Sequence, residues 1–338
     1  MIFIILLYFK LLKNITGGQN MILDIHADIF SDIFMKRLNN ENNIMKRYHL
    51  DKYKEGGVNG GIFVFWQDPE LIKYYNYEGL KLMMKYADEE IKLSNDFLYI
   101  AKNYEEYIHG LEQNKITAMM HLEGAKSLEN KIDKVEEIYK YGIRTASLTW
   151  NEENLLATGA RGSSENGLKP MGKDFIKECE SIGITIDVSH ANDKTFYDIY
   201  NVSTKPIIAT HSNARILCSS KRNLLDDQIK LIKETDGIIG INSYTDFIHD
   251  DRDKQDLKHL VNHIDYIVDL IGIDNVCFGF DYCDYLDLDE GDCTKNLENT
   301  SKSQNILIEL RRRGYKEEHI EKIAYKNYLR FIKKNFHK

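Results

Sequence analysis

Short apolar runs alternate with longer amphipathic stretches along the chain from Met21 onward. The runs are rich in Ile, Val, Phe and Thr, which is typical of buried strands. There are eight of them, at residues 22–25, 61–66, 116–122, 144–150, 183–189, 205–211, 237–243 and 275–281. Because strands that alternate with helices are joined by crossovers and pair in parallel, this pattern predicts an α/β fold.

The stretches between the runs show helical periodicity. It is clearest at 260–272, where apolar residues recur at spacings of three and four. The segments 134–142, 173–183 and 260–272 each end in a glycine, as helices often do at their C-terminal end. We therefore predict a helix in each of these three segments.

A closed barrel and an open doubly wound sheet would both produce this alternation. No GxGxxG or GxxxxGK[ST] motif follows any run, although nucleotide-binding open sheets usually carry one. Polar residues instead stand at the C-terminal ends of several runs, where barrel enzymes hold their catalytic groups. We predict a (β/α)8 barrel of the TIM type, formed as a single domain by residues 21–338.

Residues 1–20 are set apart from this domain. Their apolar segment, MIFIILLYFKLL, is too short to span a bilayer and lacks the basic start and small-residue cleavage site of a signal peptide. Met21 opens the first predicted strand. We expect translation to start there, with residues 1–20 an upstream extension or a weak anchor and no stable membrane insertion.

Composition excludes some classes of function. The net charge of −8 and the lack of any basic run argue against nucleic-acid binding. The five cysteines form no CxxC pair, which indicates neither a disulfide framework nor a thiolate zinc site and favours the cytoplasm.

Candidate chemistry lies at the ends of the runs. His26 and Asp28 follow the first run two residues apart, so both side chains face the same way on a strand. Glu123 ends the third run, where a buried carboxylate is costly unless it is paired or bound to metal. Each also has an ordinary explanation, as a strand exit, a helix cap or a rim salt bridge.

Two histidines and an aspartate strengthen the metal interpretation. His190 and His211 end successive runs, and neutral imidazole is the commonest metal ligand among side chains. Asp281 ends the last run, which lies beside the first in a closed barrel and suits a general base. Together these residues match the requirements of hydrolysis by a metal-activated hydroxide.

The same segments resemble the membrane dipeptidase (renal dipeptidase) family of the amidohydrolase superfamily. The resemblance spans nearly everything from Asp24 to the C-terminal helix, and its most specific element is His211 followed eleven residues later by Arg222-Asn223. The matching segments are DIHAD (24–28), GGIFVFW (60–66), HLEGAKSL (121–128), YGIRTASLTW (141–150), DVSHAND (187–193), THSNARILCSSKRNLLDD (210–227) and FGFDYCDYL (278–286).

The resemblance implies a zinc-dependent dipeptidase with a metal-activated bridging water. His26, Asp28 and Glu123 would hold one zinc ion, and Glu123, His190 and His211 the other. Other divalent ions are compatible with ligation this rich in carboxylates. The family also implies a free dipeptide as substrate and a homodimer as the assembly.

Three further residues receive roles from the resemblance. Asp281 would handle the proton of the bridging water, with Asp284 a weaker rival. Arg222 would grip the free carboxylate of the dipeptide, where a guanidinium fork fits two oxygens. Tyr244 would line the substrate pocket, although a rim aromatic is an equally simple interpretation.

The sequence departs from the family where the mammalian enzymes carry a histidine thought to stabilise the oxyanion. Here the position is Trp150, followed by Asn151. An indole N–H donates one hydrogen bond, and such transition-state donors contribute about 2.7–4 kcal/mol. We expect Trp150 and Asn151 to contact substrate. His121 is either a core histidine, which we favour, or a partner of Glu123, and the other histidines read as surface residues.

Two alternatives remain open. Another dinuclear amidohydrolase reaction, on a lactone, a cyclic amide or a deaminase substrate, would use the same ligands. A non-catalytic metal-binding or peptide-binding relative would retain them without turnover.

Overall fold

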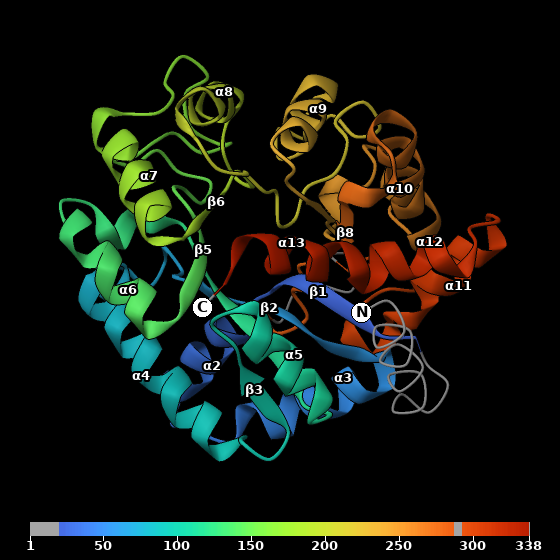
Figure 1. The fold of residues 1–338 in the computed structure, drawn as a ribbon, viewed down its shortest axis with the longest axis horizontal. Coiled ribbons are helices and arrows are strands. Elements are labelled where there is room, and N and C mark those ends of the chain that lie inside the picture. Colours follow the sequence, from blue (N-terminus) through green and yellow to red (C-terminus); the bar gives the residue numbers. More distant parts are fainter. Residues whose placement is uncertain (1–19, 287–292, 338) are drawn as a thin grey trace.

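The computed structural model describes residues 20–286 and 293–337, so the prediction for residues 1–20 lies almost wholly outside the described part (Figure 1). Its strands are β1 (Ile22–Ala27), β2 (Val58–Trp66), β3 (Leu98–Ile100), β4 (Ile116–Glu123), β5 (Ile143–Ser147), β6 (Thr185–Asp187), β7 (Ile239–Ile241) and β8 (Val276–Phe278). Its α-helices are α2 (Ile29–Leu38), α3 (Leu50–Gly56), α4 (Tyr77–Leu93), α5 (Tyr104–Glu112), α6 (Val135–Tyr141), α7 (Pro170–Ile182), α8 (Asp193–Val202), α9 (Asp226–Glu234), α10 (Leu257–Ile271), α11 (Gln304–Arg312), α12 (Glu317–Glu321) and α13 (Asn327–Asn335). Two π-helical turns are η1 (Met45–His49) and η10 (Lys322–Lys326).

The strands form one curled parallel sheet in the order β6-β5-β4-β2-β1-β8-β7. The segment between α8 and α9 joins the two ends of this order. Ile208 bridges Asp187 of β6, and Ala209 bridges Ile239 of β7, both in parallel. The backbone hydrogen bonds of this segment therefore close the ring, and the prediction of a TIM-type barrel is confirmed.

All eight predicted runs contribute to the ring, but two details differ from the prediction. Residues 205–211 form only isolated bridges and no extended strand. β3 was not predicted, because three residues are too few to show a period. It pairs with Ile116–Ala118 at the start of β4, before β5 takes over that edge.

The helices surround the strands (Figure 1). The three predicted helices are confirmed as α6, α7 and α10, and each is followed by a glycine with positive φ at Gly142, Gly183 or Gly272. Within the described residues, no helix combines the length and the apolar character needed to cross a bilayer.

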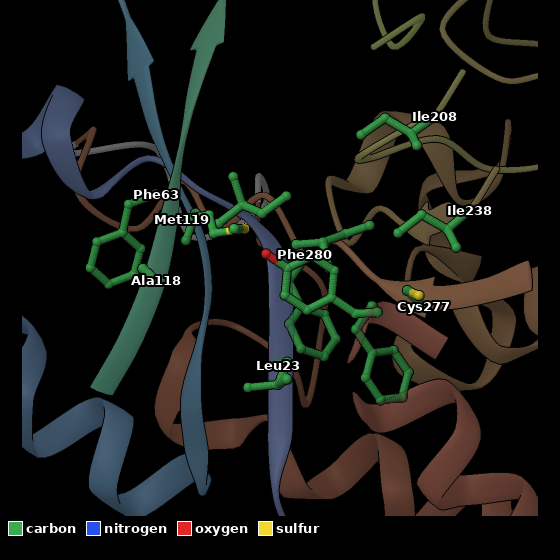
Figure 2. Close-up of a cluster of buried hydrophobic side chains, with 14 of the residues drawn as sticks. Leu23, Phe63, Ala118, Met119, Ile208, Ile238, Cys277 and Phe280 are labelled. Carbon is green, nitrogen blue, oxygen red and sulfur yellow. The ribbon is translucent and has the colours of Figure 1, made fainter. Parts of the chain in front are cut away.

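Buried apolar side chains from several strands form one core, including Leu23, Met119 and Phe280 (Figure 2). The C-terminal helices seal the N-terminal end of the barrel. There Asn327 Nδ2 donates to the carbonyl of Val276 at 2.8 Å, and Tyr328 Oη donates to that of Gly61 at 3.3 Å. The polar residues of the site lie at the opposite end of the barrel, where the strands have their C-terminal ends.

Candidate metal centre

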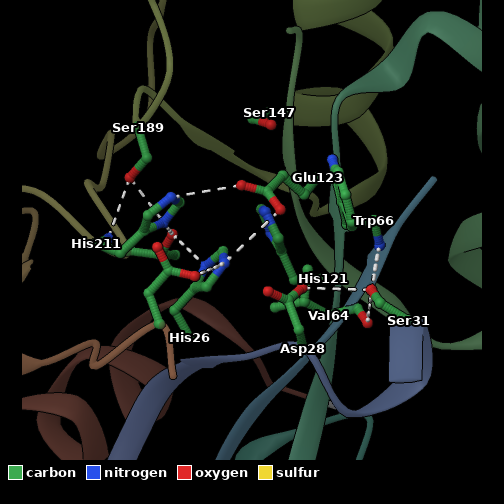
Figure 3. Close-up of polar contacts among 12 residues, drawn as sticks. His26, Asp28, Ser31, Val64, Trp66, His121, Glu123, Ser147, Ser189 and His211 are labelled. Atoms are coloured by element: carbon green, nitrogen blue, oxygen red, sulfur yellow. Dashed lines mark hydrogen bonds and ion pairs between the residues drawn. The ribbon is translucent and has the colours of Figure 1, made fainter. Parts of the chain in front are cut away.

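Glu123, the last residue of β4, is the meeting point of three histidines from different parts of the barrel, two of which, His26 and His211, are labelled in Figure 3. Its Oε1 lies 2.7 Å from His190 Nε2 and 3.4 Å from His211 Nε2. Its Oε2 lies 3.7 Å from His26 Nε2. One carboxylate oxygen thus faces a pair of imidazoles and the other faces a third imidazole.

Two aspartates complete the side of the centre that holds His26. The ligand atoms of His26, Asp28 and Asp281 lie within 4.8 Å of one another, as do those of Glu123, His190 and His211. Both carboxylates are held in place, since Ser31 Oγ donates to Asp28 at 3.3 Å and Asn242 Nδ2 donates to Asp281 at 3.0 Å. The structure therefore brings together all five predicted ligands and the predicted base.

The far side of each imidazole is hydrogen-bonded. His26 Nδ1 and His211 Nδ1 lie 3.0 and 2.9 Å from Thr210 Oγ1, and His190 Nδ1 lies 3.0 Å from Asn151 Oδ1. The Nε2 atoms are left to face Glu123, and that of His26 is buried without a hydrogen-bond partner. Histidines that bind metal usually have this arrangement, in which one ring nitrogen is hydrogen-bonded to a neighbouring group and the other is free to bind the ion.

The charges of the centre are unfavourable for a polypeptide alone. Burial, and then neighbouring carboxylates, raise the pKa of Asp28 and of Glu123 well above their ordinary values. Burial raises the pKa of Asp281 to about 6, against the opposing effects of Arg222 and the Asn242 hydrogen bond. Two buried carboxylates and a partly buried third, placed this closely, are stabilised by bound cations, so the residues fit a metal cofactor.

The backbone at the centre is strained at two of the predicted residues. His190 and Asp281 both have φ of +56°, in the left-handed region. A residue other than glycine costs on the order of 1–3 kcal/mol in such a conformation, and these costs concentrate at functional sites. Here the two strained residues contact the centre, His190 at Glu123 and Asp281 at 3.9 Å from His26 Nε2.

A cavity of about 160 Å³ opens beside the carboxylates. Its wall includes the predicted substrate residues Trp150, Asn151 and Tyr244. It also includes residues that the sequence did not single out, namely Trp66, Arg161, Phe247, Cys283, Tyr285 and Leu286. Most of these lie in loops with no periodic pattern, so only their place in the fold reveals them.

Arg222 lies close to the cavity but is not among the described residues that line it. Its guanidinium carbon is 5.3 Å from the ring centre of Phe247, and its Nη2 donates to the carbonyl of His211 at 3.4 Å. Its Nε is buried without a partner, and burial lowers its pKa to about 10. Asp284, the weaker rival of Asp281, is instead paired with Lys52 at 2.5 Å.

The expectations for three histidines outside the centre can be compared with the structure. His121 is a fully buried histidine whose Nδ1 contacts Thr145 Oγ1 at 2.9 Å, as favoured. The surface interpretation was wrong for two others. His49 is buried and its Nε2 lies 2.7 Å from Asp32 Oδ2. His263 is fully buried in α10, with its Nε2 2.8 Å from the carbonyl of Ile248. Position 263 follows Leu260 by three residues and so belongs to the buried stripe of the helix.

Comparison with known families agrees with this arrangement. The sequence matches the membrane dipeptidase family, peptidase family M19, over residues 15–337. The chain belongs to the membrane dipeptidase family. The predicted resemblance is thus confirmed, and with it a metallodipeptidase type of enzyme that uses a metal cofactor.

Relatives of this membrane dipeptidase family member come from bacteria and fungi. An uncharacterized protein from the pqqA 5′ region of Klebsiella pneumoniae is 33% identical over 236 residues, covering 67% of this chain and 85% of that protein. The dipeptidase tcpJ of Claviceps purpurea is 27% identical over 245 residues, covering 72% of this chain and 56% of that protein.

Solved structures share the fold. A metallopeptidase from Rhodobacter sphaeroides, liganded with a phosphinate mimic of the dipeptide L-Ala-D-Ala, is similar with a TM-score of 0.83 at 22% identity. The match covers 94% of this chain and 100% of that one.

Proposed function

We propose that this chain is a dinuclear zinc dipeptidase that hydrolyses the peptide bond of free dipeptides. The observation that carries the proposal is the convergence of three imidazole Nε2 atoms on the two oxygens of Glu123. His26, Asp28 and Glu123 would hold one zinc ion, and Glu123, His190 and His211 the other. Imidazole and carboxylate ligands in this ratio suit zinc, although other divalent ions accept them.

The ions would supply Lewis acidity toward the scissile carbonyl and an acidified water as nucleophile. Asp281 would accept the proton of that water and deliver it to the leaving amine. The hydrogen bond from Asn242 fixes the orientation of this carboxylate, as a general base requires.

Recognition of a free dipeptide requires a cation for its carboxylate. Arg222 would serve, because its Nε lacks a partner and Phe247 holds its guanidinium plane. Trp150, Asn151 and Tyr244 would form the walls around the substrate. The dipeptide mimic in the Rhodobacter sphaeroides metallopeptidase supports a substrate of this size for the fold.

Cellular location and assembly belong to the same proposal. Cys179, Cys218, Cys277 and Cys283 are all thiols, which supports a reducing compartment such as the cytoplasm. The homodimer rests on the family alone, and light scattering would test it.

The substrate assignment is tested by offering matched pairs of compounds to the zinc-loaded chain. L,L and L,D dipeptides would be compared with the same dipeptides carrying a C-terminal amide, and with a lactone and a cyclic amide. We expect cleavage of free dipeptides and little cleavage of their amides. Equal cleavage of the amides, or turnover confined to the lactone or cyclic amide, would contradict the dipeptidase assignment and favour another amidohydrolase reaction.

A further inference from the structure

We propose that Thr210 is a positioning residue that sets the ring tautomer of one histidine in each half of the metal centre. The proposal rests on the proposed function only in treating those histidines as metal ligands. Thr210 lies in the segment that closes the barrel between β6 and β7, and it is fully buried.

The Thr210 hydroxyl contacts three ionisable side chains. Its Oγ1 is 2.5 Å from Asp187 Oδ2, 3.0 Å from His26 Nδ1 and 2.9 Å from His211 Nδ1. Ser189 Oγ is farther away, at 3.4 Å, and already accepts the backbone N–H of His211 at 3.1 Å. One hydroxyl therefore links a histidine from each proposed zinc site to one carboxylate.

The direction of these bonds follows from the number of protons available. Oδ1 of Asp187 accepts the backbone N–H groups of Ser189 at 2.9 Å and Thr210 at 3.1 Å, which orients the carboxylate as an acceptor. Its Oδ2 then accepts the hydroxyl proton of Thr210. A hydroxyl has one proton and two lone pairs, so both lone pairs remain for the two histidines.

Each Nδ1 must consequently be the donor to Thr210. His26 and His211 are then protonated on Nδ1 and carry a free lone pair on Nε2, the atom that faces Glu123. This assignment also bears on a contact that would be an N–H···N hydrogen bond if either Nε2 carried a proton. Nε2 of His211 lies 2.9 Å from Nε2 of His190, whose Nδ1 faces the Asn151 oxygen. Two lone pairs at that distance repel each other unless a cation binds both.

The backbone holds Thr210 firmly in this position. A Cβ atom on Gly240 or on Gly279 would lie only 1.9 or 1.8 Å from the Thr210 carbonyl oxygen. Gly240 of β7 and Gly279, which follows β8, therefore approach the Thr210 backbone as closely as glycine allows. His26, Asp187 and His211 also lie close enough together to suggest a cation site, but the Thr210 hydroxyl is bonded to all three and occupies the place where they converge.

Removing the hydroxyl should weaken metal binding in both halves of the centre. Thr210→Val keeps the shape of the side chain but accepts no hydrogen bond, so neither Nδ1–H has a partner. Thr210→Ser keeps the hydroxyl and is the conservative rescue. Thr117→Val makes the same change in a fully buried threonine of β4 whose hydroxyl donates to the carbonyl of Lys115, away from the centre.

The affinity of each metal-free variant for zinc would be measured by competition with a chromophoric chelator. Loss of a partner of this kind typically lowers metal affinity about 10- to 100-fold. We expect that loss at both sites in Thr210→Val, with near-parental binding in Thr210→Ser and Thr117→Val. Parental affinity in a folded Thr210→Val, or loss at one site only, would overturn the proposal.

A second measurement needs no variant to fold and no metal to bind. The ring nitrogens of the metal-free parent, labelled with ¹⁵N in histidine, report each tautomer by NMR. We expect Nδ1–H for His26 and His211, and a proton on Nε2 of either would contradict the proposal. If the parent shows these tautomers but cleaves no dipeptide, the proposed function fails and the role of Thr210 in orienting the rings stands.

Discussion

Glu123 makes both halves of the centre depend on a single side chain. Its two oxygens face different imidazoles, and each imidazole is tethered at its other nitrogen by Thr210 or Asn151. In each of the three imidazoles, Nδ1 contacts a neighbouring side-chain oxygen and Nε2 faces Glu123. The two side chains that would act on substrate, Asp281 and Arg222, can be tested separately from the ligands.

Asp281→Asn should lower kcat by about 10²- to 10⁴-fold, the usual contribution of a general base, without releasing metal. Asp284→Asn is the matched control, because Asp284 is paired with Lys52. Turnover and metal content would be measured on both variants. Loss of metal from Asp281→Asn would identify Asp281 as a ligand, which its distance of 3.9 Å from His26 Nε2 also allows.

Arg222→Lys should raise KM for a free dipeptide by about 10- to 100-fold with a smaller change in kcat. A charged hydrogen bond contributes about 1.5–3 kcal/mol, and lysine cannot form the two-pronged contact. Arg161→Lys, at the cavity wall, is the control and should change KM little. The opposite ranking of the two variants would give the carboxylate-binding role to Arg161.

The sequence singled out the proposed ligands but not the residues that hold them in place. His26, Asp28, Glu123, His190 and His211 stand at strand ends in recognisable segments. Thr210 and Asn242 also lie at strand ends, but a threonine or an asparagine there has many ordinary explanations. Only the folded structure shows that Thr210 contacts two imidazoles and that Asn242 donates a hydrogen bond to Asp281. Arg161 gives no signal, because it lies in a loop.

At the scale of elements, long periodic segments were predictable and short ones were not. α10 has a clear apolar stripe, yet His263 lies within that stripe and was taken for a surface residue. Burial of His263 is tolerated because both ring nitrogens are hydrogen-bonded. Its Nε2 contacts the carbonyl of Ile248, and its Nδ1 accepts the backbone N–H of Ala214 at 3.1 Å. β3 has no pattern of its own and pairs with the start of β4, whereas the predicted run 205–211 forms only isolated bridges to β6 and β7.

The pH dependence of stability can be tested in α11. Arg312 and Arg313 bind Glu309 at 2.7 and 2.9 Å, and Arg312 foremost lowers the pKa of that carboxyl from 4.5 to about 2. The contribution of these ion pairs to the free energy of unfolding is therefore fully present above pH 4.5. It is lost as the pH falls toward 2, because the Glu309 carboxyl becomes protonated. Glu309→Gln should therefore reduce the free energy of unfolding by on the order of 1 kcal/mol at pH 7.

That loss should shrink as the pH is lowered from about 5 to about 2, because the parent carboxyl becomes neutral as well. Urea unfolding of both proteins across this range measures it. Glu318→Gln changes an exposed glutamate of α12 that lies 3.7 Å from His319, and serves as the control. A destabilisation of Glu309→Gln that stays constant with pH would show that the ion pairs do not cause it.

At the scale of the whole molecule, the closed ring explains why residues distant in sequence share one centre. β1, β4, the segment after β6 and the end of β8 each deliver a polar residue to the same end of the barrel. The C-terminal helices seal the other end. The order of the predicted runs around the ring was predictable, because alternation and strand-end polarity both reflect the barrel.

The most direct test of the central claim is the metal content of Glu123→Gln beside the parent. Glu90→Gln is the control. Glu90 is a buried carboxylate of α4 that accepts the N–H of Met45 and does not belong to the centre. We predict about two zinc ions per chain in the parent and in Glu90→Gln, and loss of both ions and of dipeptide turnover in Glu123→Gln. Two tightly bound ions in a folded Glu123→Gln would contradict a centre built on that carboxylate.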